Sequence, residues 1–392
     1  MRICHIITRL IVGGAQENTL LTCEGLHQRG HDVLLLTGPQ TGPEGSLHER
    51  AGRGGYAFEF VNPLQREIHL LKDRASRKGL SRRLRAWRPD VVHTHSSKAG
   101  VIGRLAARDA EVPFIVHTVH GMSFNRTQSA LKRRAFAIIE RHCAKFTHRI
   151  VSIADAMTEQ SLAAHVGRAA QYCTIYSGVE VDQFDPGRHD RQEVRRAWGF
   201  DDRAIVVGSI ARMSAHKGYE PLMAAMRLAV RQDDRLRFVW VGGGAWRERF
   251  ESQLDGAGLR KRVVMTGLVQ PAEIPRLLVG MDMLVHASQW EGLPRAIVQA
   301  LLMERPAISF DIDGASEVVV PGQTGELVRL NDARALADAM IQLAEDPERR
   351  ARLGQSGRQR CIRQFDHRHM VEQIERLYAA MSSQGDENGG HR

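Results

Sequence analysis

The chain is poor in cysteine and has no long hydrophobic run. Its five cysteines are scattered over 392 residues, without a Cys-x-x-Cys pair or a Cys/His spacing typical of metal sites. This pattern excludes a disulfide framework and a cysteine-based metal centre, and it indicates a reducing compartment such as the cytoplasm. No stretch of about 18 uncharged apolar residues occurs, so no transmembrane helix is predicted. The apolar start, Met1 to Val12, is interrupted by Arg9 and is expected to be a first β-strand rather than a signal peptide.

Acidic residues are too few to balance the basic ones. Lys and Arg number 55 against 45 Asp and Glu, which gives a formal charge of +10 and favours anionic partners such as phosphorylated substrates or anionic lipid. Leu131, Ala135 and Ile138 recur at helical spacing while Arg134 and Arg141 share another face, which predicts a basic amphipathic helix. A solvated basic face and a membrane-surface role both remain open. Basic platforms interleaved with aromatics are missing, so no nucleic-acid partner is expected.

Two successive series of short β-branched runs alternate with helical patterns. The expected strands are 3–7, 33–37, 91–94, 114–118, 150–153 and 174–176 in the first series, and 205–210, 237–241, 263–266, 283–286 and 307–310 in the second. Such alternation predicts an α/β fold of two Rossmann-like, doubly wound domains that face each other across a cleft. The expected parts are a first Rossmann-like domain (1–180), a linker (181–202), a second Rossmann-like domain (203–365), a returning C-terminal helix (366–383) and a disordered tail (384–392).

Loops that follow strands are the places to look for chemistry in such sheets. Gly13 and Gly14 precede the first helix, whose N-terminal amides could meet an anion, although a plain turn explains two glycines as well. His120 ends the strand from 114 and could donate or accept a proton near pH 7. His93 and His95 are two residues apart, but no third ligand has a suitable spacing, so no metal site is predicted there.

The first strand of the second series is followed by two cations, Arg212 and Lys217, just before a helix. A guanidinium fork and an ammonium at this spacing could converge on a diphosphate and stabilise the charge of a departing nucleotide. Two solvated surface cations are the alternative interpretation. Three consecutive glycines, 242–244, follow the next strand and permit close backbone approach.

The most informative segment is Ser288 to Ala300. Pro294 suits the start of a helix, so Glu291 lies in the preceding loop, Gly292 and Leu293 present backbone amides, and Gln299 lies about a turn and a half inside the helix. One side chain could then reach a sugar while the other reaches a nucleotide. A glutamate near a helix start is also common as a simple cap.

Taken together, these motifs resemble the retaining glycosyltransferases of family 4, which have the GT-B architecture. The resemblance spans nearly the whole chain, from Gly-Gly-Ala-Gln at 13–16 through His-Thr-His-Ser-Ser-Lys-Ala-Gly at 93–100 and His-Gly at 120–121 to Glu-Gly-Leu-Pro at 291–294. It implies that Arg212 and Lys217 hold the donor diphosphate together with Gly13 and Gly14. It also implies that Glu291, Gly292 and Leu293 meet the donor, that position 299 faces the ribose, and that His120 lies near the reacting sugar.

One departure from the family pattern is Gln299, where a second glutamate usually stands eight residues after the first. An uncharged acceptor there should alter nucleotide selection without abolishing activity. Ser177, where many relatives have Asn, is a smaller departure. The tripeptide Asp311-Ile312-Asp313 matches the metal-binding motif of another glycosyltransferase architecture, but it follows a strand late in the second series, where the resemblance implies no divalent ion.

The resulting hypothesis is a retaining hexosyltransferase (EC 2.4) that needs no metal and no cofactor beyond its substrate, a UDP- or GDP-sugar. The acceptor would be a glycan or a lipid-linked molecule in cell-surface polysaccharide or glycolipid synthesis. The expected location is the cytoplasm, with peripheral binding to an anionic inner membrane face as an open extension. Two alternatives remain: an isomerase of the nucleotide-sugar 2-epimerase kind, and a catalytically silent sugar-nucleotide-binding protein.

Overall fold

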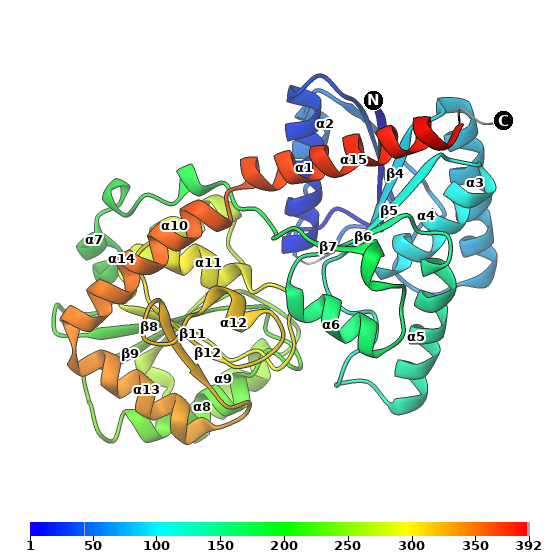
Figure 1. Cartoon of the computed structure of the whole chain (residues 1–392). Coiled ribbons are helices and arrows are strands. Elements are labelled where there is room, and N and C mark those ends of the chain that lie inside the picture. Colours follow the sequence, from blue (N-terminus) through cyan, green and yellow to red (C-terminus); the bar gives the residue numbers. More distant parts are fainter. Residues whose placement is uncertain (43, 390–392) are drawn as a thin grey trace. The chain divides into compact units, whose positions relative to one another are not determined.

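The computed structural model describes residues 1–42 and 44–389, without the side chains of 384–389. The chain divides into two compact units (Figure 1). The first unit comprises Met1–Gly178 together with the C-terminal segment from His367, and the second comprises Val179–Asp366. Each unit is a parallel sheet with helices on both faces, which confirms the predicted two-domain Rossmann-like α/β fold.

The sheet of the first unit has seven parallel strands in the order β3-β2-β1-β4-β5-β6-β7. The strands are β1 (Arg2–Ile7), β2 (Asp32–Thr37), β3 (Ala57–Phe60), β4 (Val91–His95), β5 (Phe114–Val119), β6 (Arg149–Ser152) and β7 (Tyr172–Thr174). The strand order reverses between β1 and β4, and ligands of such sheets bind beyond the carboxyl ends of the strands at this switch point.

Helices cover both faces of the first sheet. They are α1 (Gly14–Gln28), α2 (His48–Arg53), α3 (Leu70–Trp87), α4 (Ser97–Asp109), α5 (Ala130–Ala144), α6 (Asp155–Ala163) and α15 (His367–Gly389). One core joins α1 and α15 to the sheet through aliphatic side chains and Tyr378. The other core packs α3 and α4 on the opposite face. The returning helix α15 lies alongside α1, so it is an integral part of the first unit (Figure 1).

The second unit has six parallel strands in the order β10-β9-β8-β11-β12-β13, and its switch point lies between β8 and β11. The strands are β8 (Ile205–Ile210), β9 (Leu236–Val241), β10 (Val263–Gly267), β11 (Met283–His286), β12 (Ala307–Phe310) and β13 (Gly325–Val328). The helices are α7 (Arg191–Ala197), α8 (Tyr219–Ala229), α9 (Arg247–Gly256), α10 (Ile274–Gly280), α11 (Arg295–Leu302), α12 (Ala315–Val318), α13 (Ala333–Glu345) and α14 (Pro347–Gln364). A hydrophobic core around Trp240, Phe250 and Phe310 covers one face of this sheet, and further buried aliphatic residues such as Leu284 and Leu301 lie outside it.

The predicted linker and tail differ from what the structure contains. Residues 181–202 include two 3₁₀ turns and helix α7, and Arg191 and Arg195 of this helix bind Asp282 next to β11. This segment therefore belongs to the second unit, because its cations are held by a carboxylate of that unit. The tail predicted from 384 continues α15 as far as Gly389, and residues 390–392 lie outside the described residues.

The predicted amphipathic helix is α5, and its apolar stripe does not pack against the sheet. In α5 the buried positions are Ala137, Glu140, Cys143 and Ala144. The predicted apolar stripe faces outward instead, since Leu131 is 81% and Ile138 is 52% exposed. The buried face of α5 follows the ion pair that Glu140 makes with Arg104, a long-range contact that periodicity does not reveal.

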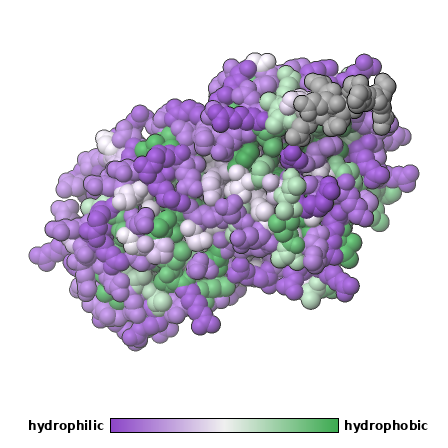
Figure 2. Space-filling view, viewed as in Figure 1, coloured by the Kyte–Doolittle hydropathy of each residue, from purple (hydrophilic) through white to green (hydrophobic). Residues whose placement is uncertain are grey.

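On the face drawn in Figure 2, the surface is mostly hydrophilic and hydrophobic residues gather in patches. Within the described residues, none of the helices combines the length and hydropathy needed to span a membrane.

Candidate functional site

Two loops meet at the switch point of the second unit, beyond β8 and β11. Gly218 directly precedes α8 with a φ of 72°, and a Cβ at this position would lie 1.6 Å from the carbonyl oxygen of Ala287. Only glycine allows this approach. The amide of Gln289 also donates to the carbonyl of His216 at 2.9 Å. The backbone thus fastens the loop that follows β8 to the loop that follows β11.

This junction brings together two residues that the sequence separates by 74 positions. The ammonium of Lys217 lies 2.5 Å from Oε1 of Glu291, and Nε2 of His286 lies 3.2 Å from the same oxygen. The amide of Glu291 donates to Asp313 at 2.9 Å. His286 and Asp313 are thus parts of the site that reasoning from the sequence missed. His286 is the last residue of β11, a position that could have marked it.

The Glu291 carboxylate is held in its ionised form. Burial by itself would raise its pKa, but the nearby Lys217 ammonium and the hydrogen bond from His286 outweigh burial and hold the pKa far below its usual range. The Glu291 side chain is 17% exposed and that of Lys217 is 28% exposed, so both remain accessible to a ligand. The cluster can accept hydroxyl donors on the carboxylate and an anion on the ammonium.

Arg212 occupies the same edge of the sheet. Its neighbours in the chain are fastened to the triglycine segment, because the Met213 amide donates to the Gly243 carbonyl at 2.8 Å. A Cβ on Gly242 would lie 2.2 Å from the carbonyl oxygen of Ala211, so this loop needs glycine as well. The Arg212 side chain is exposed at this edge, on the same loop as Lys217. The two cations therefore share one loop, as the sequence predicts.

The segment before α11 supplies backbone donors. Among the described residues, no hydrogen bond uses the amides of Gly292 and Leu293, which lie just ahead of Pro294. Gln299 lies half-buried on the second turn of α11, and its side-chain amide makes no hydrogen bond within the described part of the chain. Gly292 and Leu293 are buried, and these groups lie next to the loop of Glu291 in the chain.

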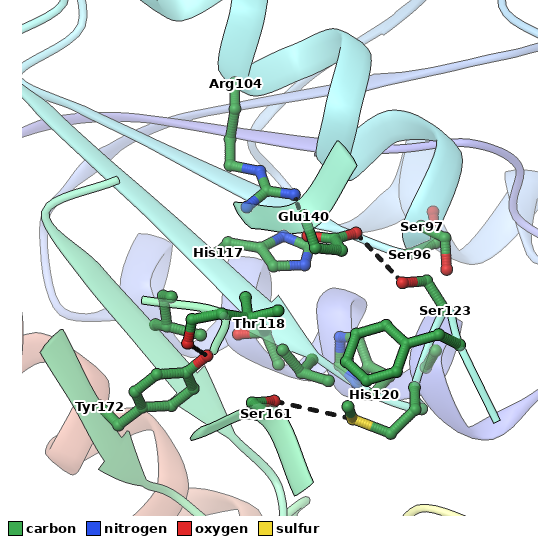
Figure 3. A pocket seen from close by; sticks show the side chains of 17 residues that line it. Ser96, Ser97, Arg104, His117, Thr118, His120, Ser123, Glu140, Ser161 and Tyr172 are labelled. Atoms are coloured by element: carbon green, nitrogen blue, oxygen red, sulfur yellow. Dashed lines mark hydrogen bonds and ion pairs between the residues drawn. The ribbon is translucent and has the colours of Figure 1, made fainter. Parts of the chain in front are cut away.

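A second candidate site lies in the first unit, where His120 lines a cavity of about 220 Å³ beyond β5 (Figure 3). Arg104 is fully buried in the wall of this cavity and binds Glu140 at 2.6 Å, and Ser123 donates to the other carboxylate oxygen at 3.3 Å. Nδ1 of the buried His117 lies 2.9 Å from the Thr94 hydroxyl oxygen. Ala15, directly after Gly14, lines the same cavity, so the start of α1 and the loop of His120 are neighbours.

Gly13 precedes α1 in an extended conformation (φ 173°) that any residue can adopt, and Gly14 is the first residue of the helix. Nothing in this backbone geometry requires glycine. A Cβ on Gly13 would meet only the end of the Gln16 side chain, at 2.9 Å. The role of this pair in anion binding stays a prediction.

The structure places a third histidine beside His93 and His95, which spacing along the sequence does not show. The register pairs His5 of β1 with His93 of β4, and the ring nitrogens of His5, His93 and His95 approach one another within 4.8 Å. Most of these nitrogens are engaged in hydrogen bonds: His95 bonds His5 at 2.9 Å and His120 at 3.0 Å, whereas Nε2 of His5 has no partner among the described residues. Pairing between strands 90 residues apart is not visible in sequence spacing.

The predicted site residues thus fall into two groups. Arg212, Lys217, Glu291, Gly292, Leu293 and Gln299 belong to the second unit, and Gly13, Gly14 and His120 belong to the first. Within each unit, the residues of a group come to the carboxyl edge of one sheet.

Two family models match the chain. Residues 190–360 match the model described as glycosyl transferases group 1, and residues 13–178 match the glycosyl transferase 4-like domain.

Similar curated proteins are glycosyltransferases. A UDP-Gal:alpha-D-GlcNAc-diphosphoundecaprenol alpha-1,3-galactosyltransferase of Escherichia coli is 28% identical over 97% of both chains. A putative glycosyltransferase, EpsD, of Bacillus subtilis (strain 168) is 27% identical over 82% of this chain and 84% of its own.

Solved structures share the fold. Anabaena HepE in complex with UDP and glucose has a TM-score of 0.83 at 21% identity, covering 97% of this chain and all of its own. Sucrose-phosphate synthase from Thermosynechococcus elongatus has a TM-score of 0.81 at 20% identity over 98% of this chain and all of its own.

Proposed function

The chain belongs to the group 1 glycosyltransferases, and from this membership we propose that it transfers a sugar, with retention, from a UDP- or GDP-sugar to a lipid-linked acceptor at a membrane surface. The observation that carries the proposal is the cluster of Lys217, Glu291 and His286 at the switch point of the second unit. Its ammonium, carboxylate and adjacent amides offer one partner for each part of a nucleotide-sugar.

In this proposal the donor binds the second unit. Arg212 and Lys217 hold the diphosphate, and the amides of Gly292 and Leu293 add neutral donors to the same anion. Glu291 accepts hydrogen bonds from sugar hydroxyls, and Gln299 faces the ribose. The charge that develops on the departing nucleotide meets donors that are already in place, which lowers the barrier to bond breaking.

The charge state of Glu291 supports a displacement without a covalent sugar-enzyme intermediate. The pKa of Glu291 lies far below its usual range, and one of its carboxylate oxygens contacts both Lys217 and His286. Such a carboxylate is a weak nucleophile. We therefore propose that the acceptor hydroxyl attacks from the face that the nucleotide leaves. Because no step in this scheme uses a divalent ion, activity should persist in the presence of EDTA.

The surface of the first unit favours a lipid-linked acceptor. Ile68, Leu70 and Leu71 at the start of α3 are 72%, 83% and 76% exposed. On α5, Leu131 and Ile138 are exposed as well, together with Ile139 at 41%. Such aliphatic side chains cost free energy in water and gain it at the boundary of a bilayer.

Cations lie between these two exposed apolar groups. A cavity of about 600 Å³ is lined by Ile68 and Ile139 and by Arg9, Arg66, Lys98 and Lys132. Aliphatic contacts combined with several cations suit a polyprenyl diphosphate at an anionic leaflet. The Escherichia coli relative named above acts on a diphosphoundecaprenol, which supports the same acceptor class.

The test is a transfer assay with UDP- and GDP-sugars, each with and without a synthetic polyprenyl-diphosphate sugar, in buffer containing EDTA. Transfer from one donor to the lipid-linked acceptor supports the proposal. Conversion of the donor sugar without an acceptor would identify an isomerase, and tight nucleotide binding without turnover would identify a silent binder. Proton NMR of the product then gives the anomeric configuration, and an inverted product contradicts the proposed displacement.

A second test concerns the membrane. The wild-type protein should sediment with vesicles that contain anionic lipid more than with neutral vesicles. Equal sedimentation with both kinds of vesicle would contradict the membrane part of the proposal and leave the donor part standing.

A further inference from the structure

Three imidazoles form a hydrogen-bonded chain in the first unit. Nε2 of His120, at the cavity, lies 3.0 Å from Nδ1 of His95, and Nε2 of His95 lies 2.9 Å from Nδ1 of His5. The chain runs from the loop after β5 through β4 to β1, crossing the switch point of the sheet. The site proposed from the sequence contains only its outer member.

The inner part of the chain is held rigidly. His5 is fully buried and His95 is 1% exposed. His93 stacks on His95 with ring centroids 4.4 Å apart. His93 is itself fixed by Tyr378 of α15 at 2.5 Å and by Thr118 at 2.6 Å.

The buried rings are neutral at pH 7. Burial lowers the pKa of His5 to about 3, and burial followed by the neighbouring histidines lowers the pKa of His95 well below its usual value. A neutral imidazole carries one N–H and one bare nitrogen.

When His120 is neutral as well, counting protons restricts the chain to two arrangements. His95 uses both of its nitrogens, so it donates one hydrogen bond and accepts the other. If it donates to His120, it must accept from His5, and all three rings carry the proton on Nδ1. If it donates to His5, all three carry the proton on Nε2. The tautomers of the three rings are therefore linked.

The inner end of the chain decides between the two arrangements. Nε2 of His5 is buried and has no hydrogen-bond partner among the described residues. Protons on Nε2 would bury an N–H without an acceptor at this end, whereas protons on Nδ1 leave a bare ring nitrogen there. Buried N–H groups without a partner are the rarer case in proteins.

We propose that His95 and His5 are positioning residues that hold His120 in its Nδ1–H tautomer, so that His120 acts as a hydrogen-bond donor. With its Nε2 accepting from His95, His120 offers an N–H to an oxygen of the bound substrate instead of accepting a proton from it. The assignment of His120 to the substrate rests on the proposed function, whereas the tautomer is a property of the protein alone.

The test is long-range ¹H–¹⁵N NMR of the full chain labelled with ¹⁵N-histidine, without substrate. The His120 signals are assigned by their loss in His120→Gln. The wild type should show His120 with its proton on Nδ1. In His95→Phe, which keeps a ring against His93 and removes both hydrogen bonds, His120 should change to the Nε2–H form that imidazole prefers in water.

Tyr378→Phe is the matched control, because it removes the bond to His93 and leaves the chain of His120, His95 and His5 intact. The tautomer of His120 should not change in this variant. If His95→Phe does not fold, His5→Phe serves instead, since it removes the inner end that decides the direction and should populate both forms of His120.

Three results would overturn the inference: a wild-type His120 with its proton on Nε2, a tautomer that is the same in wild type and His95→Phe, or a stoichiometric metal ion in the purified protein. In the transfer assay we expect His95→Phe to lower kcat about 10-fold, which corresponds to the loss of one hydrogen bond in the transition state. The affinity of the second unit for the nucleotide should not change. A protein without transferase activity would contradict the proposed function, while the NMR result would still decide the tautomer.

Discussion

Replacing Glu291 with glutamine tests the charge of the candidate donor site. The substitution keeps the size of the side chain and removes the charged partner of Lys217, which is also the contact of His286. Hydrogen bonds to a charged group contribute about 1.5–3 kcal/mol, so we expect the free energy of unfolding of the second unit to fall by about 2 kcal/mol at pH 7. The Glu291 side chain is only 17% exposed, which limits screening by solvent.

This stability difference should depend on pH in one direction. The pKa of Glu291 is lowered in the folded protein from an ordinary value of 4.5. The stabilisation is therefore fully present above pH 4.5, where the unfolded chain is also ionised, and it is lost as the pH falls further below that value. Wild type and Glu291→Gln should thus converge in stability on acidification from pH 4.5.

The assay is urea unfolding followed by tryptophan fluorescence. Four of the five tryptophans, Trp198, Trp240, Trp246 and Trp290, belong to the second unit and report on it. In parallel, kcat/KM for the transfer should fall about 10- to 100-fold, because a charged acceptor of sugar hydroxyls becomes neutral.

Glu326→Gln is the matched control. Glu326 forms an ion pair with Arg349 in the same unit, with side chains 20% and 28% exposed, close to the values for Glu291 and Lys217. It should lose stability in a similar way and keep full kcat/KM. Full activity in Glu291→Gln, or an equal loss of activity in Glu326→Gln, would refute the assignment of Glu291 to the donor sugar.

Other consequences of the structure are open to direct measurement. Gly218→Ala should weaken UDP or GDP binding at least 10-fold in calorimetry. The added Cβ would displace the Ala287 carbonyl and separate Lys217 from Glu291. Unchanged affinity would show that the junction does not shape the site. Asp282→Asn should lower the free energy of unfolding of the second unit, measured in urea, by about 3 kcal/mol. The reason is that Arg191 and the buried Arg195 lose their carboxylate partner. A loss under about 1 kcal/mol would contradict this expectation. Leu131→Glu should reduce sedimentation with anionic vesicles. It should not lower the midpoint of thermal unfolding, because Leu131 is 81% exposed. The matched control Ile362→Glu, at a 41% exposed residue of the second unit, should leave sedimentation unchanged.

Most strands were predictable from local pattern, and the exceptions have physical causes. The runs at 205–210, 283–286 and 307–310 match β8, β11 and β12, because strands buried on both faces of a parallel sheet are continuously apolar. β3 and β13 were missed because they are short edge strands with charged residues among the apolar ones. The last strand of the first sheet was expected at 174–176 and lies at Tyr172–Thr174, also at an edge.

The candidate site was predictable where its residues are neighbours in the chain. Arg212 and Lys217 lie on one loop, and Glu291, Gly292 and Leu293 lie on another, so spacing along the sequence was sufficient. The contact between Lys217 and Glu291 was not predictable from spacing, because it depends on the adjacency of β8 and β11 and on the approach of Gly218 to Ala287.

The sequence by itself determined the α/β class, the division into two similar domains and the family, because these depend on apolar periodicity and on motifs within single loops. The tertiary structure alone decided that His5 joins His95 and His120, that Lys217 and His286 share one oxygen of Glu291, and that Leu131 and Ile138 face outward. Each of these features joins or orients side chains through the order of strands and the packing of helices, so it arises from contacts between segments that are distant in the chain.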